Sequence, residues 1–409
     1  MLLTGTLPPQ IGNLSFLTSL NLMNNSFHGS LPIQLANLHR LRFIELGENY
    51  FYEEIPSWFG SFPELQYLSL SANKFTGQIP SDMFERLPKL QSLNLGMNNL
   101  SGKIPIDLLK CKELQFINLE SNRLEGILPE EIGNLTKLRS LHLDNNRIQG
   151  KRKKIILFRI AKQLTMSNNG LLRHPPPMYN LTRLRILDLS RNHLSGSPNP
   201  FDFPSLLNLE QLNISFNMFG GSIPSTISNL TRLTILDTFT NYLSGEIPSG
   251  MFERLSKLQV LDLVSAWIPT SIPMSLFKCK ELQIMNLVDC GFEGILPKEI
   301  GNLTMLRSLD LTYNEIEGNL LNLEQLSINF NRLKGPILPF ISNSTRLTFL
   351  HLFNNSLTGQ IPSDIGDIIY LEEVNISRGL LEGYLPPSIG NLTRLRILDL
   401  SHNSLTGHL

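Results

Sequence analysis

One motif recurs along almost the whole chain, and this repetition most constrains the possible fold. Segments such as LTSLNLMNNSFHG, LQYLSLSANKFTG and LRILDLSHNSLTG fit the pattern L-x-x-L-x-L-x-x-N-x-L-x-G. Measured at the Asn of this pattern, the chain holds seventeen repeats, and steps of 23–25 residues separate all but one neighbouring pair. The exception is a step of 17 residues between Asn314 and Asn331. Because repeats of this kind bury their apolar edges on one another, the pattern predicts a solenoid.

A longer repeat lies on top of the short one. The segment 55–141, which contains MFERLPKLQSL, recurs at 223–309, which contains MFERLSKLQVL. The offset is 168 residues, or seven repeats of 24, and we interpret it as a block duplication. Repeats that can be copied in blocks indicate one continuous domain over residues 1–409, with an eroded repeat at 151–180 and a shortened repeat at 314–331.

Each part of the repeat has a predicted structural role. L-x-x-L-x-L alternates apolar and polar residues, which is typical of a short strand with one buried face. Successive strands would form a parallel sheet with a spacing of about 4.8 Å. The Asn lies at the turn after each strand, where its buried amide can satisfy backbone groups and build a ladder. The predicted ladder consists of Asn25, Asn49, Asn73, Asn98, Asn122, Asn146, Asn169, Asn192, Asn217, Asn241, Asn314, Asn331, Asn355 and Asn403.

The second half of the repeat carries a family resemblance. The signature L-x-G-x-I-P occurs at 100–105, 243–248 and 357–362, and at 75–80 with Phe in place of the Leu. It resembles the plant-specific class of extracellular leucine-rich repeats, and the resemblance covers essentially all 409 residues. This implies an α/β solenoid, mostly strand and irregular, in which about 17 repeats of 24 residues form a right-handed superhelix with a parallel concave sheet. In that class, such repeats form the ectodomains of receptor-like kinases and receptor-like proteins.

The two ends depart from the family pattern. Met1 falls in the middle of a repeat, and the final LTGHL stops inside another. The Cys-containing module that caps the N-terminus of family members is absent, so we expect a solenoid that is uncapped at both ends. We interpret the chain as a fragment or a truncated copy of a larger receptor. The kinase signatures are absent too, so any kinase domain would belong to the full-length protein.

Composition and motifs argue against several functional classes. Lys+Arg and Asp+Glu are both 35, which argues against a nucleic-acid partner. No stretch approaches 18 apolar residues and no signal peptide is present, so this chain is not expected to insert into a membrane. No catalytic or metal-binding motif is found, and we predict a chain without enzymatic activity, cofactor or metal. Cys111 and Cys279 replace a buried Leu, and Cys290 takes a ladder position.

Glycosylation sequons are frequent. N-x-[ST] is partly a consequence of the N-L-T consensus of the repeat, yet the extracellular class favours real glycan sites. Three further sequons, at Asn213, Asn354 and Asn375, fall in or beside strands and are weaker candidates. The main candidates are Asn13, Asn24, Asn99, Asn134, Asn180, Asn229, Asn302, Asn343 and Asn391.

The concave sheet is the expected binding surface. From the tenth repeat onward, apolar residues enter the position two residues before the ladder, at Phe239, Val264, Val288 and Phe353, and contiguous exposed apolar residues commonly mark interaction sites. Aromatic residues one position later add possible anchors, and a row of Asp residues could favour a basic group on a ligand. The competing readings are drift in a decaying duplicate for the aromatics and a plain L-D-L-S strand consensus for the acids. The predicted site consists of Phe216, Asp237, Phe239, Asp262, Val264, Val288, Asp310, Tyr313, Phe330 and Phe353.

These observations and the resemblance lead to one hypothesis and two alternatives. The hypothesis is a non-catalytic recognition module of a plant receptor-like kinase or receptor-like protein in defence or developmental signalling. Its partners would be a peptide or protein ligand and a co-receptor ectodomain, and its location the extracellular side of the plasma membrane. The alternatives are a secreted inhibitor-type or structural repeat protein, and a truncated duplicate that has no function.

Overall fold

The computed structural model describes residues 2–149, 161–173, 182–198, 206–248, 250–317, 325–337 and 346–407. The chain forms two compact units. Unit 1 comprises Met1–Gly196 and Pro200–Leu209, and unit 2 comprises Ser197–Asn199 and Glu210–Leu409. The single domain over 1–409 stays a prediction, and most of the eroded repeat at 151–180 lies outside the described residues.

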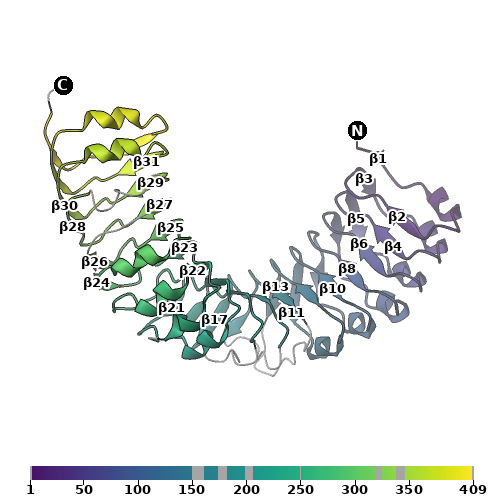
Figure 1. Cartoon of the computed structure of the whole chain (residues 1–409). Coiled ribbons are helices and arrows are strands. Elements are labelled where there is room, and N and C mark those ends of the chain that lie inside the picture. Colours follow the sequence, from purple (N-terminus) through teal and green to yellow (C-terminus); the bar gives the residue numbers. More distant parts are fainter. Residues whose placement is uncertain are drawn as a thin grey trace. The chain divides into compact units, whose positions relative to one another are not determined.

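The main sheet of unit 1 contains one short strand per repeat, and every strand is parallel to the next (Figure 1). Its register aligns equivalent repeat positions, so that Leu68 pairs with Leu93 and Leu93 with Ile117. The strands in order are β2 (Ser19–Asn21), β4 (Phe43–Glu45), β6 (Tyr67–Ser69), β8 (Ser92–Asn94), β10 (Phe116–Asn118), β12 (Ser140–His142), β14 (Gln163–Thr165) and β16 (Ile186–Asp188).

Unit 2 repeats the same arrangement in a second parallel main sheet. The shortened repeat is accommodated without a break, because Ser308 still pairs with Gln325 in regular register. The strands in order are β18 (Gln211–Asn213), β20 (Ile235–Asp237), β22 (Val260–Asp262), β23 (Ile284–Asn286), β25 (Ser308–Asp310), β27 (Gln325–Ser327), β29 (Phe349–His351), β31 (Glu373–Asn375) and β33 (Ile397–Asp399).

A second set of short strands follows the turn after each main strand except β22, where only an isolated bridge joins Trp267 to Ser244. These strands also pair in parallel with their counterparts on the next coil, for example β5 with β7 and β30 with β32. They are β1 (Thr4–Gly5), β3 (Ser26–Gly29), β5 (Tyr50–Glu54), β7 (Lys74–Thr76), β9 (Ser101–Gly102), β11 (Arg123–Ile127), β13 (Arg147–Gln149), β15 (Leu172–Arg173), β17 (His193–Gly196), β19 (Met218–Gly221), β21 (Tyr242–Leu243), β24 (Glu293–Ile295), β26 (Glu315–Glu317), β28 (Lys334–Gly335), β30 (Ser356–Gly359), β32 (Leu380–Gly383) and β34 (Ser404–Leu405).

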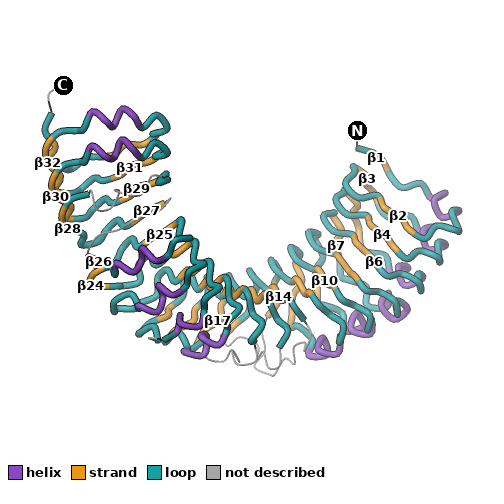
Figure 2. The backbone as a smooth tube through the Cα atoms, in the orientation of Figure 1, coloured by secondary structure: helices purple, strands orange, loops and turns teal. Residues whose placement is uncertain are grey.

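In most of the coils whose return segment is described, the chain then returns through a single turn of 3-10 helix (Figure 2). In most coils a Pro directly precedes this helix, where its missing N–H ends the strand pairing. The helices are η1 (Pro9–Asn13), η2 (Ile33–Asn37), η3 (Ser57–Ser61), η4 (Asp82–Arg86), η5 (Ile106–Lys110), η6 (Glu130–Asn134), η8 (Ser225–Asn229), η9 (Met251–Arg254), η10 (Met274–Lys278), η11 (Lys298–Asn302), η12 (Ser363–Asp367) and η13 (Pro387–Asn391). The predicted solenoid of short parallel strands is confirmed.

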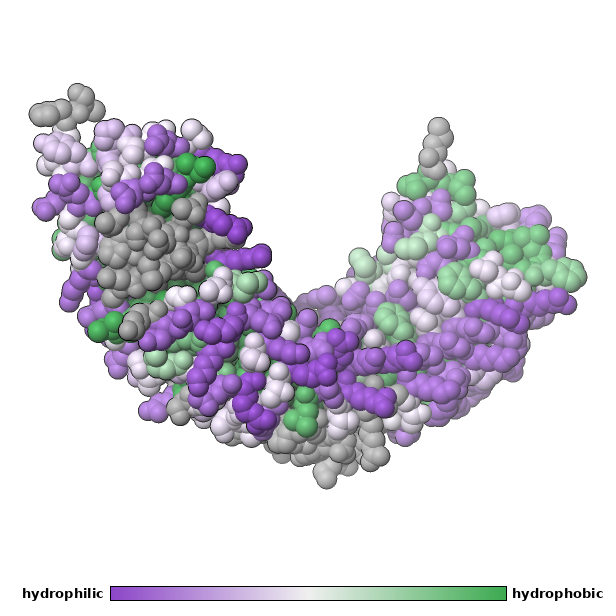
Figure 3. Space-filling view, viewed as in Figure 1, coloured by the Kyte–Doolittle hydropathy of each residue, from purple (hydrophilic) through white to green (hydrophobic). Residues whose placement is uncertain are grey.

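The core of each unit is a stack of aliphatic and Phe side chains shared between neighbouring coils. Val374 lies between two coils and is fully buried, whereas the equivalent Leu398 of β33 has a paired strand on one side only and is 41% exposed. At the other end, the first coils expose Leu14, Phe16 and Ile33, and hydrophobic surface gathers over this end in Figure 3. The burial of each coil therefore depends on both of its neighbours.

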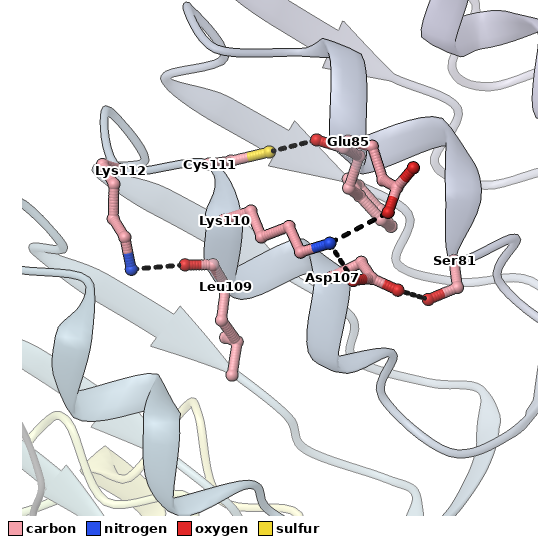
Figure 4. Close-up of polar contacts among 8 residues, drawn as sticks. Ser81, Glu85, Asp107, Leu109, Lys110, Cys111 and Lys112 are labelled. Atoms are coloured by element: carbon pink, nitrogen blue, oxygen red, sulfur yellow. Dashed lines mark hydrogen bonds and ion pairs between the residues drawn. The ribbon is translucent and has the colours of Figure 1, made fainter.

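Polar contacts join the coils on the side of the 3-10 helices (Figure 4). Lys110 Nζ lies 2.9 Å from Glu85 Oε1 and 2.7 Å from Asp107 Oδ1, and the Ser81 hydroxyl donates to Asp107. The thiol of Cys111 lies 3.5 Å from the carbonyl oxygen of Phe84. Burial raises the pKa of Cys111 to about 12, so this thiol behaves as an inert part of the core.

The ladder asparagines hold the turn after each main strand. Asn73 is typical: its Nδ2 donates to the carbonyl oxygens of Leu46 (2.9 Å) and Leu70 (3.2 Å), and its Oδ1 accepts from the N–H of Phe51 (2.9 Å). The side-chain amides of all fourteen predicted ladder residues donate to backbone carbonyl oxygens in this way. Each amide therefore links backbone groups that the turn would otherwise leave unsatisfied.

The residue just before each ladder position adopts a left-handed backbone conformation. This holds in all seventeen coils, with φ between 50° and 61°. The residues at this position are as different as Asn24, Ala72, Phe216 and Tyr313. The residue type in the sequence therefore does not predict the left-handed conformation. Asn tolerates φ > 0 readily, whereas a bulky aromatic residue is an outlier there.

Candidate functional site

The main-sheet face of unit 2 brings the predicted aromatic residues into two clusters. Phe216 and Phe239 form an edge-to-face pair with ring centroids 4.7 Å apart. We call them the aromatic pair. Tyr313, Phe330 and Phe353 form the aromatic triad, in which Tyr313 stacks on Phe330 at 4.2 Å and Phe330 meets Phe353 edge-on at 4.7 Å. Tyr313 is 52% exposed, so the triad presents ring surface to solvent.

The stretch between the clusters differs from the sequence expectation. Val264 is only 7% exposed, so the prediction that it belongs to an exposed apolar patch is wrong for this residue. It lies on the coil between those of Phe239 and Val288, and at a strand spacing of about 4.8 Å its short side chain is enclosed by its neighbours. Val288 is half-buried. The predicted apolar stripe is therefore two aromatic clusters with a recessed segment between them.

The predicted acidic residues accept hydrogen bonds from the backbone in addition to lining the main-sheet face of unit 2. Asp237 Oδ1 accepts from the N–H of Phe239 at 3.0 Å, and Asp310 Oδ1 accepts from the N–H of Thr312 at 2.9 Å. Asn or Asp at the same strand end makes this contact in many other coils. Examples are Asn21, Asn94, Asn118, Asp188, Asn213, Asn375 and Asp399. Sequence reasoning missed this cap, although the recurrence of Asn and Asp at one position was the signal for it.

Asp262 has the most perturbed carboxyl group of this face. Burial, reinforced by the neighbouring Asp237, raises its pKa to about 6. Its Oδ1 accepts from the N–H of Val264 at 3.3 Å, and its Oδ2 accepts from Asn286 Nδ2 at 3.0 Å. Asn286 Oδ1 is buried and has no hydrogen-bond partner among the described residues. The face therefore carries negative charge that decreases as the pH falls through about 6.

Three residues of the clusters are held in the left-handed conformation described above. Phe216, Tyr313 and Phe330 have φ of 51°, 57° and 51°. Strained backbone of this kind costs on the order of 1–3 kcal/mol and concentrates at functional sites. The repeat itself sets this positive φ, since all seventeen coils share it, and the three rings occupy the position at a higher cost than an Asn would.

The ladder is interrupted beneath the recessed segment. Ala266 and Cys290 replace Asn on successive coils, and both are buried. The thiol of Cys290 lies 3.1 Å from the carbonyl oxygen of Leu263, and the N–H of Ile268 donates to the backbone oxygen of Cys290 at 2.7 Å. The Cys290 thiol therefore replaces the contact that a ladder Asn amide makes with a backbone carbonyl oxygen. The backbone oxygen of Cys290 replaces the Asn side-chain oxygen as the acceptor of a backbone N–H.

The described sequons lie mainly on the surface. Asn13, Asn24, Asn99, Asn134, Asn302 and Asn391 are exposed, and Asn229 is half-buried with its Oδ1 accepting from Arg254 at 3.0 Å. Asn180 and Asn343 lie outside the described residues. Of the weaker candidates, Asn213 and Asn375 each accept from a backbone N–H, of Ser215 and Ser377, so those side chains have a structural role.

Neither a metal cluster nor a membrane span was found in the part of the chain that the structure describes. No group of three or more His, Cys, Asp or Glu there is placed to hold a metal ion. Likewise, no described helix has the length and apolar character to cross a membrane. The three cysteines are all buried and free.

Family models match many of the coils. A leucine-rich-repeat model matches residues 55–100, and another matches residues 302–319. A third leucine-rich-repeat model matches residues 16–38, 113–135, 183–206, 208–230, 281–303, 346–368 and 394–409.

Solved structures of plant receptors share this fold. The plant peptide hormone receptor RGFR1 in complex with RGF2 is 32% identical with a TM-score of 0.88, over 100% of this chain and 70% of that chain. The Arabidopsis receptor kinase HAESA, in complex with the peptide hormone IDA and the co-receptor SERK1, is 30% identical with a TM-score of 0.79. That match covers 99% of this chain and 73% of the HAESA chain.

Two curated relatives come from Arabidopsis thaliana. Receptor-like protein 39 is 28% identical over 195 residues, and receptor-like protein 24 is 41% identical over 63 residues. These matches span only 20% and 7% of the lengths of those two proteins. From the repeat pattern, the solenoid and these similarities together, the chain belongs to the leucine-rich-repeat family, in the plant extracellular class that includes these receptor ectodomains.

Proposed function

We propose that this chain is a ligand-recognition segment of a plant cell-surface receptor, and that it binds a peptide segment on the main-sheet face of unit 2. The similar receptors RGFR1 and HAESA were solved in complex with peptide hormones. Their leucine-rich-repeat ectodomain fold is a non-catalytic recognition module, which fits a role in binding rather than catalysis. A stack of coils locked by ladder hydrogen bonds also offers a preformed surface, so little conformational entropy is lost on binding.

The aromatic pair and the aromatic triad are the observation that carries this proposal. Partly exposed rings that already contact one another present large rigid areas to a ligand, and buried aromatic residues dominate the energy of many interfaces. Phe216, Tyr313 and Phe330 occupy left-handed positions at which an Asn would cost less stability, and this supports a role for the rings themselves.

The spacing of the two clusters fits a short extended peptide. Phe239 lies on the coil of β20 and Tyr313 on the coil of β25, three coils further along the stack. At about 4.8 Å per coil, this separation is roughly 14 Å, which an extended peptide crosses with about four residues. One peptide can therefore place a side chain on each cluster and pass over the recessed Val264 between them.

The acidic residues between the two aromatic clusters add a preference for a basic ligand group. Asp237, Asp262 and Asp310 line the same face between the clusters, so a basic side chain or an amino group of the ligand would be favoured there. Because each carboxylate already accepts a backbone N–H, the acids would contribute attraction and orientation more than new hydrogen bonds.

The wider context is part of the same proposal. We place the parent protein at the plasma membrane, with this segment outside the cell, glycosylated at exposed sequons such as Asn13 and Asn391. Ligand binding would recruit a co-receptor ectodomain, as the complex of HAESA with IDA and SERK1 suggests by analogy. The signalling role would lie in defence or development.

The proposal can be tested with a pool of random 12-residue peptides displayed on phage and selected on the purified chain. The selected pool should lose at least about tenfold in affinity for Phe330→Asn, because this change removes the central ring of the triad. Asn tolerates the left-handed backbone at this position, so the variant should fold, and its melting temperature verifies this.

Met97→Asn is the matched control. Met97 is exposed and has the same left-handed conformation (φ 56°), but it lies in unit 1. This control should bind the selected pool like the wild type. Equal binding by Phe330→Asn and the wild type would overturn the proposal, and so would a selection that enriches no peptide above background.

A further inference from the structure

A basic hollow lies at one edge of unit 1, apart from the face discussed above. Its volume is about 420 Å³, and its lining residues are Gln115, Thr136, Lys137, Arg139, Lys162 and Arg183. Four of these six side chains are cationic and none is acidic. All four cations are exposed, so they can reach a ligand in solution.

The stacking of the coils creates this cluster. Arg139 directly precedes β12 and Lys162 directly precedes β14, so the two residues hold the same position on adjacent coils. The N–H of Lys162 donates to the carbonyl oxygen of Arg139 at 2.7 Å, which fixes their separation. Arg183 lies shortly before β16 on the next coil. Three cations from three successive coils therefore converge although they are far apart in sequence.

The hollow also differs from the rest of this edge in its charge balance. On earlier coils a cation is neutralised by a carboxylate of the preceding coil: Lys89 Nζ lies 2.6 Å from Glu64 Oε1. Lys137 follows the same rule, since Glu113 contacts it at 2.6 Å. Arg139, Lys162 and Arg183 have no carboxylate within ion-pair distance among the described residues. Their positive charge is therefore left uncompensated in a concave site, which strengthens the local potential.

The side chains offered by the hollow select a particular ligand chemistry. Two guanidinium groups can each donate paired hydrogen bonds to an oxyanion, and the Lys162 ammonium adds a point charge. The Thr136 hydroxyl and the Gln115 amide supply neutral donors. We propose that this hollow binds a sulfate or phosphate ester group of a ligand. This site is independent of the peptide-binding face proposed for unit 2.

One sequon must be controlled in the experiment. Thr136 is the third residue of the sequon that begins at Asn134, so a glycan on Asn134 would stand beside the hollow. The test therefore uses the chain with Asn134→Gln as its reference protein. Asn134 is exposed at the end of η6, so this change leaves the core intact.

The experiment titrates methyl sulfate and methyl phosphate into the reference protein by isothermal calorimetry at low ionic strength. We expect saturable binding that weakens as salt is added. Arg139→Gln combined with Lys162→Gln should weaken the binding by at least about tenfold, because two charge-assisted contacts are lost. The matched control is Lys89→Gln with Lys278→Gln, which removes two exposed cations that are paired with Glu64 and Glu253. This control should stay within about twofold of the reference protein.

The two probes distinguish the sources of the anion. A phosphate ester gains its second charge near pH 6, so its affinity should rise between about pH 5 and pH 7.5, whereas that of the sulfate should not change. Saturable binding of either probe that fails in the Arg139 and Lys162 variant supports the site and identifies the favoured group. Binding that does not saturate, or that weakens equally in the control variant, would overturn the proposal.

Discussion

The duplicated block appears once in each unit, at 55–141 and at 223–309, and the two copies have kept their interiors while changing their faces. Cys111 and Cys279 are both fully buried, with thiols 3.5 Å and 3.7 Å from the carbonyl oxygens of Phe84 and Phe252. The ion pairs Lys110–Glu85 and Lys278–Glu253 both have a length of 2.9 Å.

The faces of the two copies have diverged. Gly96 of the first copy corresponds to Val264 of the second, and the exposed Asn99 corresponds to the exposed Trp267. Interior residues contact two neighbouring coils at once, so a change there disturbs three coils together. Face residues meet solvent on one side and can vary singly. Specificity can therefore evolve on the face of a duplicated block while the stack beneath it stays constant.

The largest expected difference between the copies concerns the ladder. Asn98 donates to the carbonyl oxygens of Leu70 and Leu95 and accepts from the N–H of Phe75, whereas Ala266 takes its place in the second copy. Asn98→Ala should lower the free energy of unfolding by about 2–4 kcal/mol, because buried backbone groups lose their partners. Urea denaturation followed by circular dichroism measures this loss.

Introducing the ladder Asn into the second copy tests the same difference between the copies in the opposite direction. Ala266→Asn should restore the missing contacts and raise the free energy of unfolding by about 1 kcal/mol. Asn99→Ala, at the exposed neighbour of Asn98, is the control and should change little. If Asn98→Ala were no more destabilising than Asn99→Ala, the ladder would not be a source of stability.

The next effect is a pH dependence that only the second copy should show. Asp262 corresponds to Asn94, and both side chains accept a backbone N–H two residues later. Burial raises the pKa of Asp262 to about 6 from a usual value near 4, so the folded state binds the extra proton between these values. The contribution of Asp262 to stability is therefore highest below about pH 4 and falls as the pH rises through about 6. Asp262→Asn should remove this slope and gain about 1–2 kcal/mol at pH 7, after allowance for solvent screening.

Asp399 provides a control of opposite sign. It occupies the same position on the last strand, where hydrogen bonds from Ser401 lower its pKa. Its contribution to stability is present above the usual carboxyl pKa and is lost as the pH falls through the lowered value. Urea midpoints from pH 3 to pH 7 should thus show opposite slopes for the Asp262→Asn and Asp399→Asn differences. A flat difference curve for Asp262→Asn would contradict the assigned pKa.

The smallest effect concerns the outer ion pairs. Lys110 contacts both Glu85 and Asp107, whereas Lys278 contacts Glu253, and Ser275 stands where the first copy has Asp107. Lys110→Ala should therefore destabilise more than Lys278→Ala, although both effects should be far smaller than that of Asn98→Ala because these ion pairs are exposed. Melting temperatures at low and high salt measure both variants. An unchanged ranking at 1 M salt would show that packing, not charge, separates them.

The sequence predicted the features that depend on the repeat itself. The strand, the turn and the ladder Asn recur at fixed spacing, so the solenoid and positions such as Asn73 could be inferred without coordinates. The left-handed residue could not, because its occupant ranges from Asn24 to Phe330. The burial of Val264 could not be inferred either, since it depends on the side chains of adjacent coils.

The same reasoning explains what could be anticipated of the two surfaces. The aromatic residues of unit 2 were visible as changes at one repeat position, and the structure shows which of them make contact. The basic hollow was not visible, because Arg139, Lys162 and Arg183 belong to different repeats and only the stacking brings them together.

The uniform left-handed residue before each ladder position has a practical consequence. Because all seventeen coils share this backbone geometry, the side chains at these positions form a series of equivalent attachment points. A recognition surface can be transplanted along the stack by exchanging side chains alone, with no remodelling of loops. In protein engineering, binding residues can therefore be introduced at equivalent positions on successive coils, one coil at a time.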